Sequence, residues 1–352
     1  MSVDAPVSAS PVADEPGDAL MIRAREMSRV YHSGDGVHAL DLSIPPGSIF
    51  GFIGPSGSGK TTTVRLCTGA LAPTSGSVEV FGQPPSTFDA AMRSRIGYMP
   101  QLSVLYEDLS VKQNLAFFAS LYGPTYSTKQ RMSDMLEFVE LSEHSAKRVS
   151  QTSGGMQRRL SLAAALVHEP DVVFLDEPTA GIDPVLRKKF WDRFRDLREA
   201  GKTLFVTTQY VGEAAYCDYV GVLADGRLIA LDTPDGLRRL AFGGDVVDVE
   251  FKRLVDVELL DEMTEAINAA SYDIRSPRTV RFVVDEASTA LPALTSWLND
   301  RSVELAQAEE FLPPYDDVFV ELVNRFRDED VGIAPGTSGR LQTTRPADLE
   351  TS

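Results

Sequence analysis

The segment at residues 54–62 carries the side chains whose types and spacing most clearly indicate chemistry. It reads Gly-Pro-Ser-Gly-Ser-Gly-Lys-Thr-Thr and fits the pattern G-x-x-x-x-G-K-[ST]. An apolar run ending at Ile53 precedes it, and a helical pattern beginning near Thr61 follows it. Glycines allow several backbone N–H groups to point at one oxyanion, and the start of a helix adds the positive end of its dipole. The segment is therefore a predicted phosphate-binding loop.

Within this loop, Lys60 would reach the β- and γ-phosphates of a nucleotide, and the Thr61 hydroxyl would bind Mg²⁺. The alternative is a glycine- and serine-rich turn that happens to contain a lysine, and the strand–loop–helix setting argues against it. The residues that we expect to contact the nucleotide here are Gly54, Pro55, Ser56, Gly57, Ser58, Gly59, Lys60, Thr61 and Thr62.

Two adjacent acids, Asp176 and Glu177, follow an apolar run at residues 172–175. Such a run is typical of a strand inside a parallel sheet, and open α/β sheets bind ligands at the carboxyl ends of their strands. Asp176 would hold Mg²⁺ through water, opposite Thr61, and Glu177 would polarise an attacking water molecule. The alternative is a strand that ends in solvated acids, and the phosphate loop argues against it.

A second predicted anion site lies at Ser153, Gly154 and Gly155, which open a helix with Met156 and Leu160 on its apolar face. Two anion sites in a single chain are not needed to bind one nucleotide. Two copies of the chain would need both sites if each nucleotide were bound between the two copies. The sequence therefore predicts that a second copy closes over the phosphate bound by the first.

Composition narrows the classes of function. The chain has 352 residues, 43% of them hydrophobic, which is enough for about two domains with buried cores. Its net charge of −17 argues against a general polyanion-binding surface, so we expect no nucleic-acid partner. Cys67 and Cys217 lack the spacing of metal ligands and suit a reducing cytosol. We expect no signal peptide and no membrane helix, so a role at a membrane would need another chain.

The chain is expected to divide into two domains with flexible ends. Residues 1–20 are rich in Ala, Pro, Ser and acids, residues 328–352 are polar and glycine-rich, and we expect both to be disordered. Residues 21–242 are predicted to form the nucleotide-binding domain. A helical subdomain at about residues 102–168 is expected to interrupt its α/β core, because apolar residues recur there at helical spacing.

From residue 243 the pattern changes. We expect strands at residues 246–251, 272–274, 279–284 and 303–308, and helices at residues 255–269 and 287–299. This βαββαβ order matches the ferredoxin-like arrangement, so residues 243–327 are predicted to form an α+β domain that ends in a helix near residues 315–326. We interpret this domain as a packing or dimer-stabilising module, with binding of a regulatory ligand as the alternative.

Taken together, these motifs resemble those of ATP-binding-cassette (ABC) ATPases over about residues 21–240. The resemblance rests on the phosphate loop, Gln101, the Ser153-Gly154-Gly155 triplet, the strand before the two acids, and the segment Ala-Gly-Ile-Asp at residues 180–183. It implies a RecA-like P-loop NTPase core with an antiparallel β subdomain and an inserted helical subdomain. It also implies that ATP and Mg²⁺ are the ligands.

The same resemblance implies roles for single residues. By its position alone, Tyr31 fits a core or edge-strand tyrosine as well as a base-stacking one, and the resemblance implies that it stacks on adenine. Gln101 would contact Mg²⁺ and the attacking water and couple the site to a membrane subunit. The Ser153 triplet would cap ATP bound by the second copy, and Asp183 would contact that copy.

Two positions depart from the usual pattern of the family. The usual Leu-Ser-Gly-Gly-Gln reads Thr-Ser-Gly-Gly-Met at residues 152–156, and Gln209 stands where the family has a histidine. An amide can hydrogen-bond a phosphate oxygen but cannot carry an imidazolium charge. We therefore expect Glu177 and Lys60 to be the catalytic residues and Gln209 only to position the γ-phosphate. The alternative is a slow or regulated ATPase.

Both departures resemble the drug-resistance branch of the family, the daunorubicin-type exporters, and so does the segment at residues 312–319. That resemblance implies an ATPase subunit that dimerises over two ATP, as a homodimer in the simplest case. It would drive a separate ABC-2 type permease from the cytoplasmic face of the membrane and export a drug, lipid or other hydrophobic compound.

Three alternative functions agree less well with the sequence. An importer ATPase often carries a C-terminal β-barrel, whereas this C-terminal region alternates strands with helices. An ATPase acting on ribosomes or nucleic acid usually has two cassettes or a zinc insert, whereas this acidic chain has one cassette. The third alternative is a subunit that only binds ATP while its partner supplies the catalytic site, and the intact set of Lys60, Asp176 and Glu177 argues against it.

Overall fold

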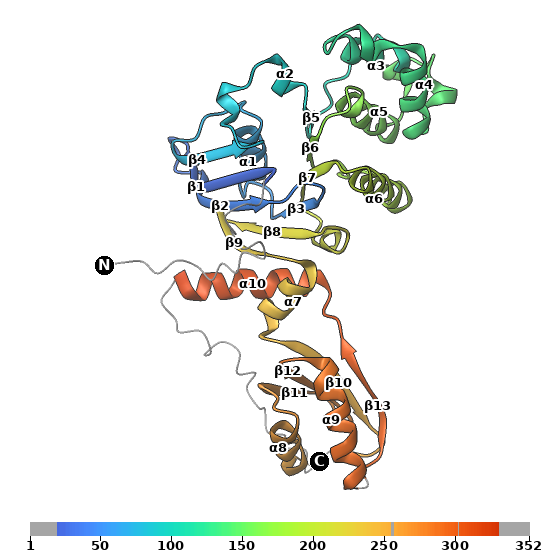
Figure 1. Ribbon diagram of the computed structural model, residues 1–352. Coiled ribbons are helices and arrows are strands. Elements are labelled where there is room, and N and C mark those ends of the chain that lie inside the picture. Colours follow the sequence, from blue (N-terminus) through green and yellow to red (C-terminus); the bar gives the residue numbers. More distant parts are fainter. Residues whose placement is uncertain (1–19, 255–256, 302, 331–352) are drawn as a thin grey trace, which may run out of the picture. The chain divides into compact units, whose positions relative to one another are not determined.

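The computed structural model describes residues 20–254, 257–301 and 303–330, which fall into two compact units with separate hydrophobic cores (Figure 1). The first unit ends at Pro234 and the second begins at Asp235. The expected disordered segments at residues 1–20 and 328–352 lie outside the described residues, apart from Leu20 and the last helix, which continues to Asp330. Among the described helices, none has the length and apolar character that a bilayer span requires.

A six-stranded sheet lies at the centre of the first unit, with the strand order β5-β6-β7-β3-β8-β9. Neighbouring strands are parallel except for β9, which forms the expected hairpin with β8 across Asp225-Gly226. β3, β6 and β7 are buried along their whole length, as expected for parallel strands covered on both faces. The strands are β3 (Ile49–Ile53), β5 (Ile96–Met99), β6 (Val172–Asp176), β7 (Thr203–Thr208), β8 (Tyr219–Ala224) and β9 (Arg227–Asp232).

A three-stranded antiparallel sheet shares one hydrophobic cluster with this central sheet. Its order is β2-β1-β4, formed by β1 (Ile22–Val30), β2 (Gly36–Ile44) and β4 (Ser75–Val80). Helix α1 (Lys60–Cys67) contacts β2, β4 and β6, whereas α6 (Pro184–Glu199) contacts β3 and β7 on the other side (Figure 1). The unit therefore has the α/β architecture with an antiparallel subdomain that the resemblance implied.

Three helices form a subdomain with its own apolar cluster: α3 (Val111–Ser120), α4 (Lys129–Phe138) and α5 (Gly154–Leu166). Ser110 and Gln113 form a capping box at the start of α3, which fixes where that helix begins. The shorter segments of the unit are α2 (Ala90–Arg93) and 3₁₀ turns at Pro85–Thr87, Pro124–Ser127, Ser142–His144, Val149–Gln151 and Val211–Tyr216. The chain is thus helical between β5 and β6, apart from the loops that join the helices.

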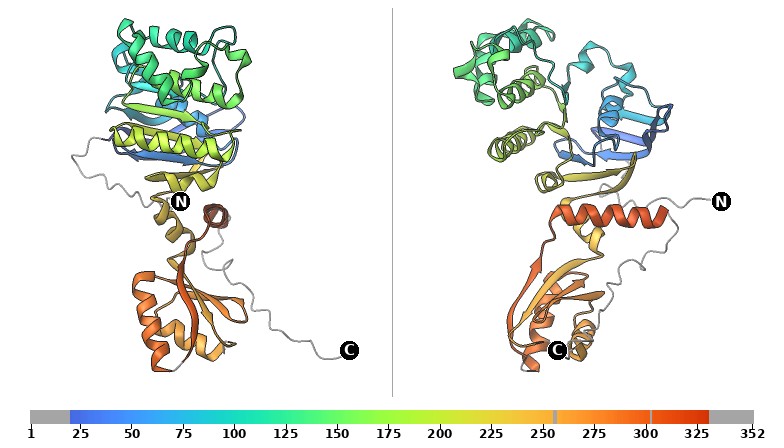
Figure 2. Two further views of the ribbon diagram at one scale, coloured as in Figure 1. Left: turned by 90° about the vertical axis from the view of Figure 1, so that its right-hand side faces the viewer. Right: turned by 180° about the vertical axis from the view of Figure 1, so that it is seen from behind.

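Helix α7 (Pro234–Phe242) starts at the last residue of the first unit and continues into the second. The second unit contains an antiparallel sheet with the order β11-β12-β10-β13. Helices α8 and α9 share an apolar cluster with this sheet (Figure 2). Helix α10 is held against α7 by Arg238, whose guanidinium lies 4.0 Å from the centroid of the Tyr315 ring. The other elements are β10 (Asp245–Phe251), α8 (Val257–Ala266), β11 (Ser271–Ser276), β12 (Thr279–Val284), α9 (Ala287–Asp300), β13 (Leu305–Phe311) and α10 (Tyr315–Asp330).

Candidate nucleotide-binding site

The predicted phosphate loop joins the end of β3 to the start of α1. Its glycines are required by geometry: Gly57 and Gly59 have φ of +83° and +105°, in the left-handed region that other residues rarely adopt. A Cβ atom on Gly54 would lie 2.3 Å from the carbonyl oxygen of Leu223. Pro55, Ser56 and Gly57 are exposed at the tip of the loop, and Thr61 and Thr62 lie in the first turn of α1.

Lys60 is buried, with 5% of its surface exposed, and its ammonium group lies inside the curve of the loop. The Nζ atom donates hydrogen bonds to the carbonyl oxygens of Gly54, at 2.8 Å, and Pro55, at 3.0 Å. It also lies 3.6 Å from Oε1 of Glu177. Burial lowers the pKa of Lys60, and the charges of Glu177 and Asp176 oppose that shift. The loop therefore holds a buried cation next to the two acids that the sequence singled out.

Asp176 ends β6 and is fixed by the neighbouring strand β7. The two strands are parallel and in a register that pairs Asp176 with Thr207, whose hydroxyl donates to Oδ1 of Asp176 at 2.6 Å. The other oxygen, Oδ2, is buried and has no hydrogen-bond partner in the described part of the chain. A buried carboxylate oxygen without a partner is costly, and carboxylate oxygens are preferred ligands of Mg²⁺. The site therefore fits a divalent cation at this carboxylate.

Glu177 follows in a left-handed backbone conformation, with φ of +49°. Its backbone N–H donates to the hydroxyl of Thr207 at 3.0 Å. Its carboxylate is held between two groups, because Gln101 Nε2 donates to Oε2 at 3.1 Å and Lys60 approaches Oε1. A non-glycine residue in this conformation is uncommon and is maintained by the surrounding structure. Gln101, Lys60 and Glu177, predicted from separate motifs, thus lie in one contact network.

Gln209 follows the end of β7 and reaches the phosphate loop. Its Oε1 accepts a hydrogen bond from the Ser56 hydroxyl at 3.2 Å, and the N–H of Gly54 donates to the Thr208 carbonyl at 3.3 Å. The carboxyl ends of β3, β5, β6 and β7 therefore bring the loop, Gln101, the two acids and Gln209 to one edge of the sheet. This is the edge at which open α/β sheets bind ligands.

Tyr31 lies at the end of β1 and is 37% exposed, so it is not a core residue. The guanidinium of Arg29 lies 5.7 Å from the centroid of the Tyr31 ring. The backbone N–H of Tyr31 donates to the Asp35 carbonyl at 2.8 Å and closes a turn between β1 and β2. The turn leads to Gly36, whose carbonyl would lie 3.1 Å from a Cβ atom on Gly59. Tyr31 therefore belongs to a turn that ends against the phosphate loop.

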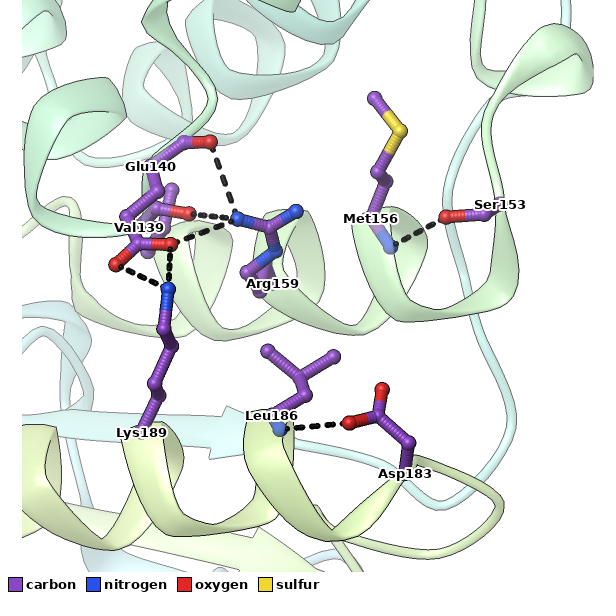
Figure 3. A network of polar contacts seen from close by, with 8 residues as sticks. All are labelled: Val139, Glu140, Ser153, Met156, Arg159, Asp183, Leu186 and Lys189. Carbon is purple, nitrogen blue, oxygen red and sulfur yellow. Dashed lines mark hydrogen bonds and ion pairs between the residues drawn. The ribbon is translucent and has the colours of Figure 1, made fainter.

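Ser153 and Asp183 each cap a helix (Figure 3). The Ser153 hydroxyl accepts from the N–H of Met156 at 3.3 Å, and Asp183 accepts from the N–H groups of Val185 and Leu186, each at 3.0 Å. Both capping residues and Gly154 are exposed. Capping explains Ser153 and Asp183 within one chain, and close packing against Leu186 explains Gly155. The glycine at the exposed position 154 is not required by any described contact.

Two residues near the acids were missed by the sequence analysis. Thr207 orients Asp176 and Glu177, and its role follows from strand register, which is not visible from a single segment of sequence. Arg158 on α5 has a buried Nη1 without a hydrogen-bond partner among the described residues. Burial lowers its pKa, while the negative charges of Glu177 and Asp176 raise it. The sequence does show a basic residue, Arg158, on the helix that follows Ser153. Its closeness to the two acids is visible only in the structure.

Comparison with known proteins agrees with this geometry. The profile of the family described as ABC transporter matches residues 37–180. The chain is 38% identical over 228 residues to "Probable multidrug ABC transporter ATP-binding protein YbhF" of Escherichia coli (strain K12), covering 64% of this chain and 39% of that protein. It is 37% identical over 276 residues to "Nod factor export ATP-binding protein I" of Cupriavidus metallidurans, covering 78% of this chain and 89% of that protein. The chain thus spans about two fifths of the multidrug relative.

A solved structure also matches. The structure of cbiO1 from Clostridium perfringens, described as part of the ABC transporter complex cbiONQ, superposes with a TM-score of 0.57 at 26% sequence identity. The superposition covers 62% of this chain and 91% of that chain.

Proposed function

The chain belongs to the ABC transporter family, and we propose that it is the ATP-binding and ATP-hydrolysing subunit of an export transporter. The observation that carries this proposal is the buried set at the edge of the sheet. Lys60 lies inside the phosphate loop, Asp176 keeps one unpartnered oxygen, and Glu177 is held between Lys60 and Gln101. A protein that only bound nucleotide would not need the second acid in this position.

The chemistry follows from these residues. Backbone N–H groups of the loop and the Lys60 ammonium bind the β- and γ-phosphates, and Tyr31 stacks on the base. Mg²⁺ would be held by Asp176, Thr61 and Gln101, and it would neutralise developing charge on the phosphate oxygens. Glu177 accepts a proton from the attacking water, while Gln209 positions the γ-phosphate as a neutral hydrogen-bonding group.

The exposed helix caps support a dimeric mechanism. Ser153, Gly154 and Gly155 bind the γ-phosphate held by a second subunit, and Asp183 contacts that subunit. We assign the second subunit to an identical chain. Closure of the dimer moves the helical subdomain and Gln101, and this movement is passed to a separate membrane permease of the ABC-2 type at the cytoplasmic face of the membrane.

The names of the relatives support the direction of transport. One is called a multidrug protein and another a Nod factor export protein, so we assign a drug, lipid or other hydrophobic compound as the exported class. The βαββαβ order of the second unit and its sheet order β11-β12-β10-β13 support a ferredoxin-like fold, and we assign this unit a packing or dimer-stabilising role. Purification of the chain with a multi-span permease would support a role in transport, whereas purification with ribosomes would contradict it.

Turnover of the purified full chain tests the catalytic assignment. We expect Glu177→Gln to lower kcat by about 100-fold or more, because a general base contributes that much, while ATP affinity is kept. Gln209→Ala should lower kcat less, because only positioning is lost. Glu137→Gln, an exposed change on α4, is the control that should leave kcat unchanged. Equal losses in Glu177→Gln and Gln209→Ala would contradict the ranking of the two residues.

A further inference from the structure

A charged network joins the helical subdomain to helix α6 of the core (Figure 3). Its centre is Glu140, which lies just after α4 with a left-handed φ of +54°. The Lys189 ammonium on α6 donates to both carboxylate oxygens of Glu140, at 2.8 and 3.1 Å. Arg159 on α5 donates from one nitrogen to the Glu140 carbonyl at 3.1 Å, the Val139 carbonyl at 3.3 Å and the Glu140 carboxylate at 3.4 Å. Glu140 therefore connects α5 and α6.

The two connected helices are the ones that begin at Ser153 and Asp183. Arg159 lies six residues after Ser153, and Lys189 lies six residues after Asp183. At the helical rise, both contacts are about 9 Å from the capping ends. The first turns also pack together, because a Cβ atom on Gly155 would lie 2.8 Å from Cδ2 of Leu186. α5 and α6 are thus in contact at their first turns and linked through Glu140 further along.

We propose that Glu140 is a positioning residue that locks α5 to α6, so that Ser153 and Asp183 meet a second copy of the chain as one rigid surface. The inference rests on the proposed function, since it needs a dimer that shares ATP. In that dimer both caps act on the partner, and a change in the angle between α5 and α6 would let only one of them reach its target. The network holds that angle once closure of the dimer has brought the helical subdomain into place.

A contribution to folding stability alone does not account for the network. The side chains of Glu140 and Lys189 are 43% and 51% exposed, and exposed ion pairs contribute little to stability. The groove beside them has an accessible volume of about 20 Å³, room for little more than one water molecule, so it is not a ligand site. Arg193 on α6 lies over the Phe138 ring at 5.0 Å, which adds a second contact between α6 and the end of α4.

The experiment uses the full chain with Glu177→Gln, in which ATP-bound dimers should accumulate because hydrolysis is slow. Glu140→Gln and Lys189→Met are compared with Glu137→Gln at the end of α4 and Lys188→Met on α6, which are exposed changes of the same kind outside the network. We expect the two network variants to weaken ATP-driven dimerisation by about threefold to tenfold, as measured by analytical ultracentrifugation. ATP affinity of the monomer and the melting temperature should match those of the controls. The double variant should be no weaker than either single variant, because both changes break one interaction.

The outcomes separate the two proposals. If the Glu177→Gln chain does not dimerise with ATP, the proposed dimer and the role of Glu140 are both wrong. If it dimerises and the network variants behave as the controls do, the dimer stands and the role of Glu140 is wrong. A loss of melting temperature or monomer ATP affinity in Glu140→Gln, with dimerisation lowered only in proportion, would assign Glu140 a purely structural role.

Discussion

At the residue scale, the orientation of Asp176 and Glu177 depends on the hydroxyl of Thr207, which belongs neither to the phosphate loop nor to the strand that ends in the two acids. Thr207 donates to Asp176 and accepts from the N–H of Glu177, so one side chain sets the direction of both acids. Lys60, Asp176 and Glu177 were predicted from sequence because each belongs to a local pattern of loop or strand end. Thr207 was not, because its role comes from the register between two strands that are distant in the chain.

Replacing Thr207 by valine tests this dependence. The change is nearly isosteric and removes the hydroxyl, so the Asp176 carboxylate loses its only described hydrogen bond. The N–H of Glu177 keeps its hydrogen bond to the Thr207 carbonyl at 3.1 Å. We expect a loss of about 1–3 kcal/mol in the free energy of unfolding and at least a tenfold loss in kcat.

Thr203→Val is the matched control for this prediction. Thr203 lies at the other end of β7, and its hydroxyl accepts from the N–H of Gly47 at 2.9 Å. It should lower the free energy of unfolding by a similar amount and leave kcat unchanged. Urea denaturation and steady-state turnover measure the two effects, and an equal loss of kcat in both variants would refute a specific role for Thr207.

At the element scale, α5 and α6 combine a role inside the chain with a proposed role outside it. Their positions could be predicted, because each begins with a capping residue and has apolar residues at helical spacing. Their mutual contact could not be predicted, because Gly155, Leu186 and Glu140 belong to three separate segments. Periodicity identifies the buried face of a helix but not the neighbour against which that face packs.

Gly154→Ala tests the tip of α5. A Cβ atom on Gly154 would meet no described atom within 4 Å outside the helix's own backbone, so the fold of a single chain does not require glycine there. Alanine is also the better helix former, and we expect an unchanged or slightly higher melting temperature. If the backbone at this tip approaches a phosphate held by a second copy, the added methyl group should reduce kcat by at least about tenfold.

Gly212→Ala is the control for this prediction, because Gly212 also has open space around its Cβ position and lies outside the site. It should leave both melting temperature and kcat unchanged. Turnover in Gly154→Ala equal to that of the unchanged chain would mean that no partner approaches this tip.

At the scale of the whole molecule, the unit that ends at Pro234 contains every residue assigned to nucleotide binding or catalysis. The α/β core with its helical insertion could be read from the order of strand and helix patterns, whereas the two compact units meet at Pro234 and Asp235, eight residues before the predicted boundary. Strand order could not, because β3 lies between β7 and β8 although it precedes both by more than a hundred residues. Long-range pairing is decided by the packing of the common core, which no local pattern contains.

The two buried thiols report on the stability of the first unit as a whole. Cys67 packs in the main hydrophobic cluster, and burial raises its pKa from the ordinary value of 9.0 to about 12. Burial also raises the pKa of Cys217, and the charges of Glu213 and Asp218 add to that shift. At pH 8 both thiols should resist alkylation in the folded chain and react once it is unfolded.

The direction of the pH effect follows from the Cys67 pKa. Between pH 9.0 and about 12 the unfolded thiol loses its proton while the folded one keeps it, so the unfolded state binds fewer protons and stability falls as pH rises. At pH 10 this thiol should lower the free energy of unfolding by about 1 kcal/mol relative to pH 8.

Because other groups also titrate in this range, the measured quantity is the difference between the unchanged chain and Cys67→Ala in urea denaturation at the two pH values. Cys67→Ala should be less stable at pH 8 but lose less on going to pH 10, and parallel losses in both chains would mean that the Cys67 thiol ionises as easily in the folded state as in the unfolded one.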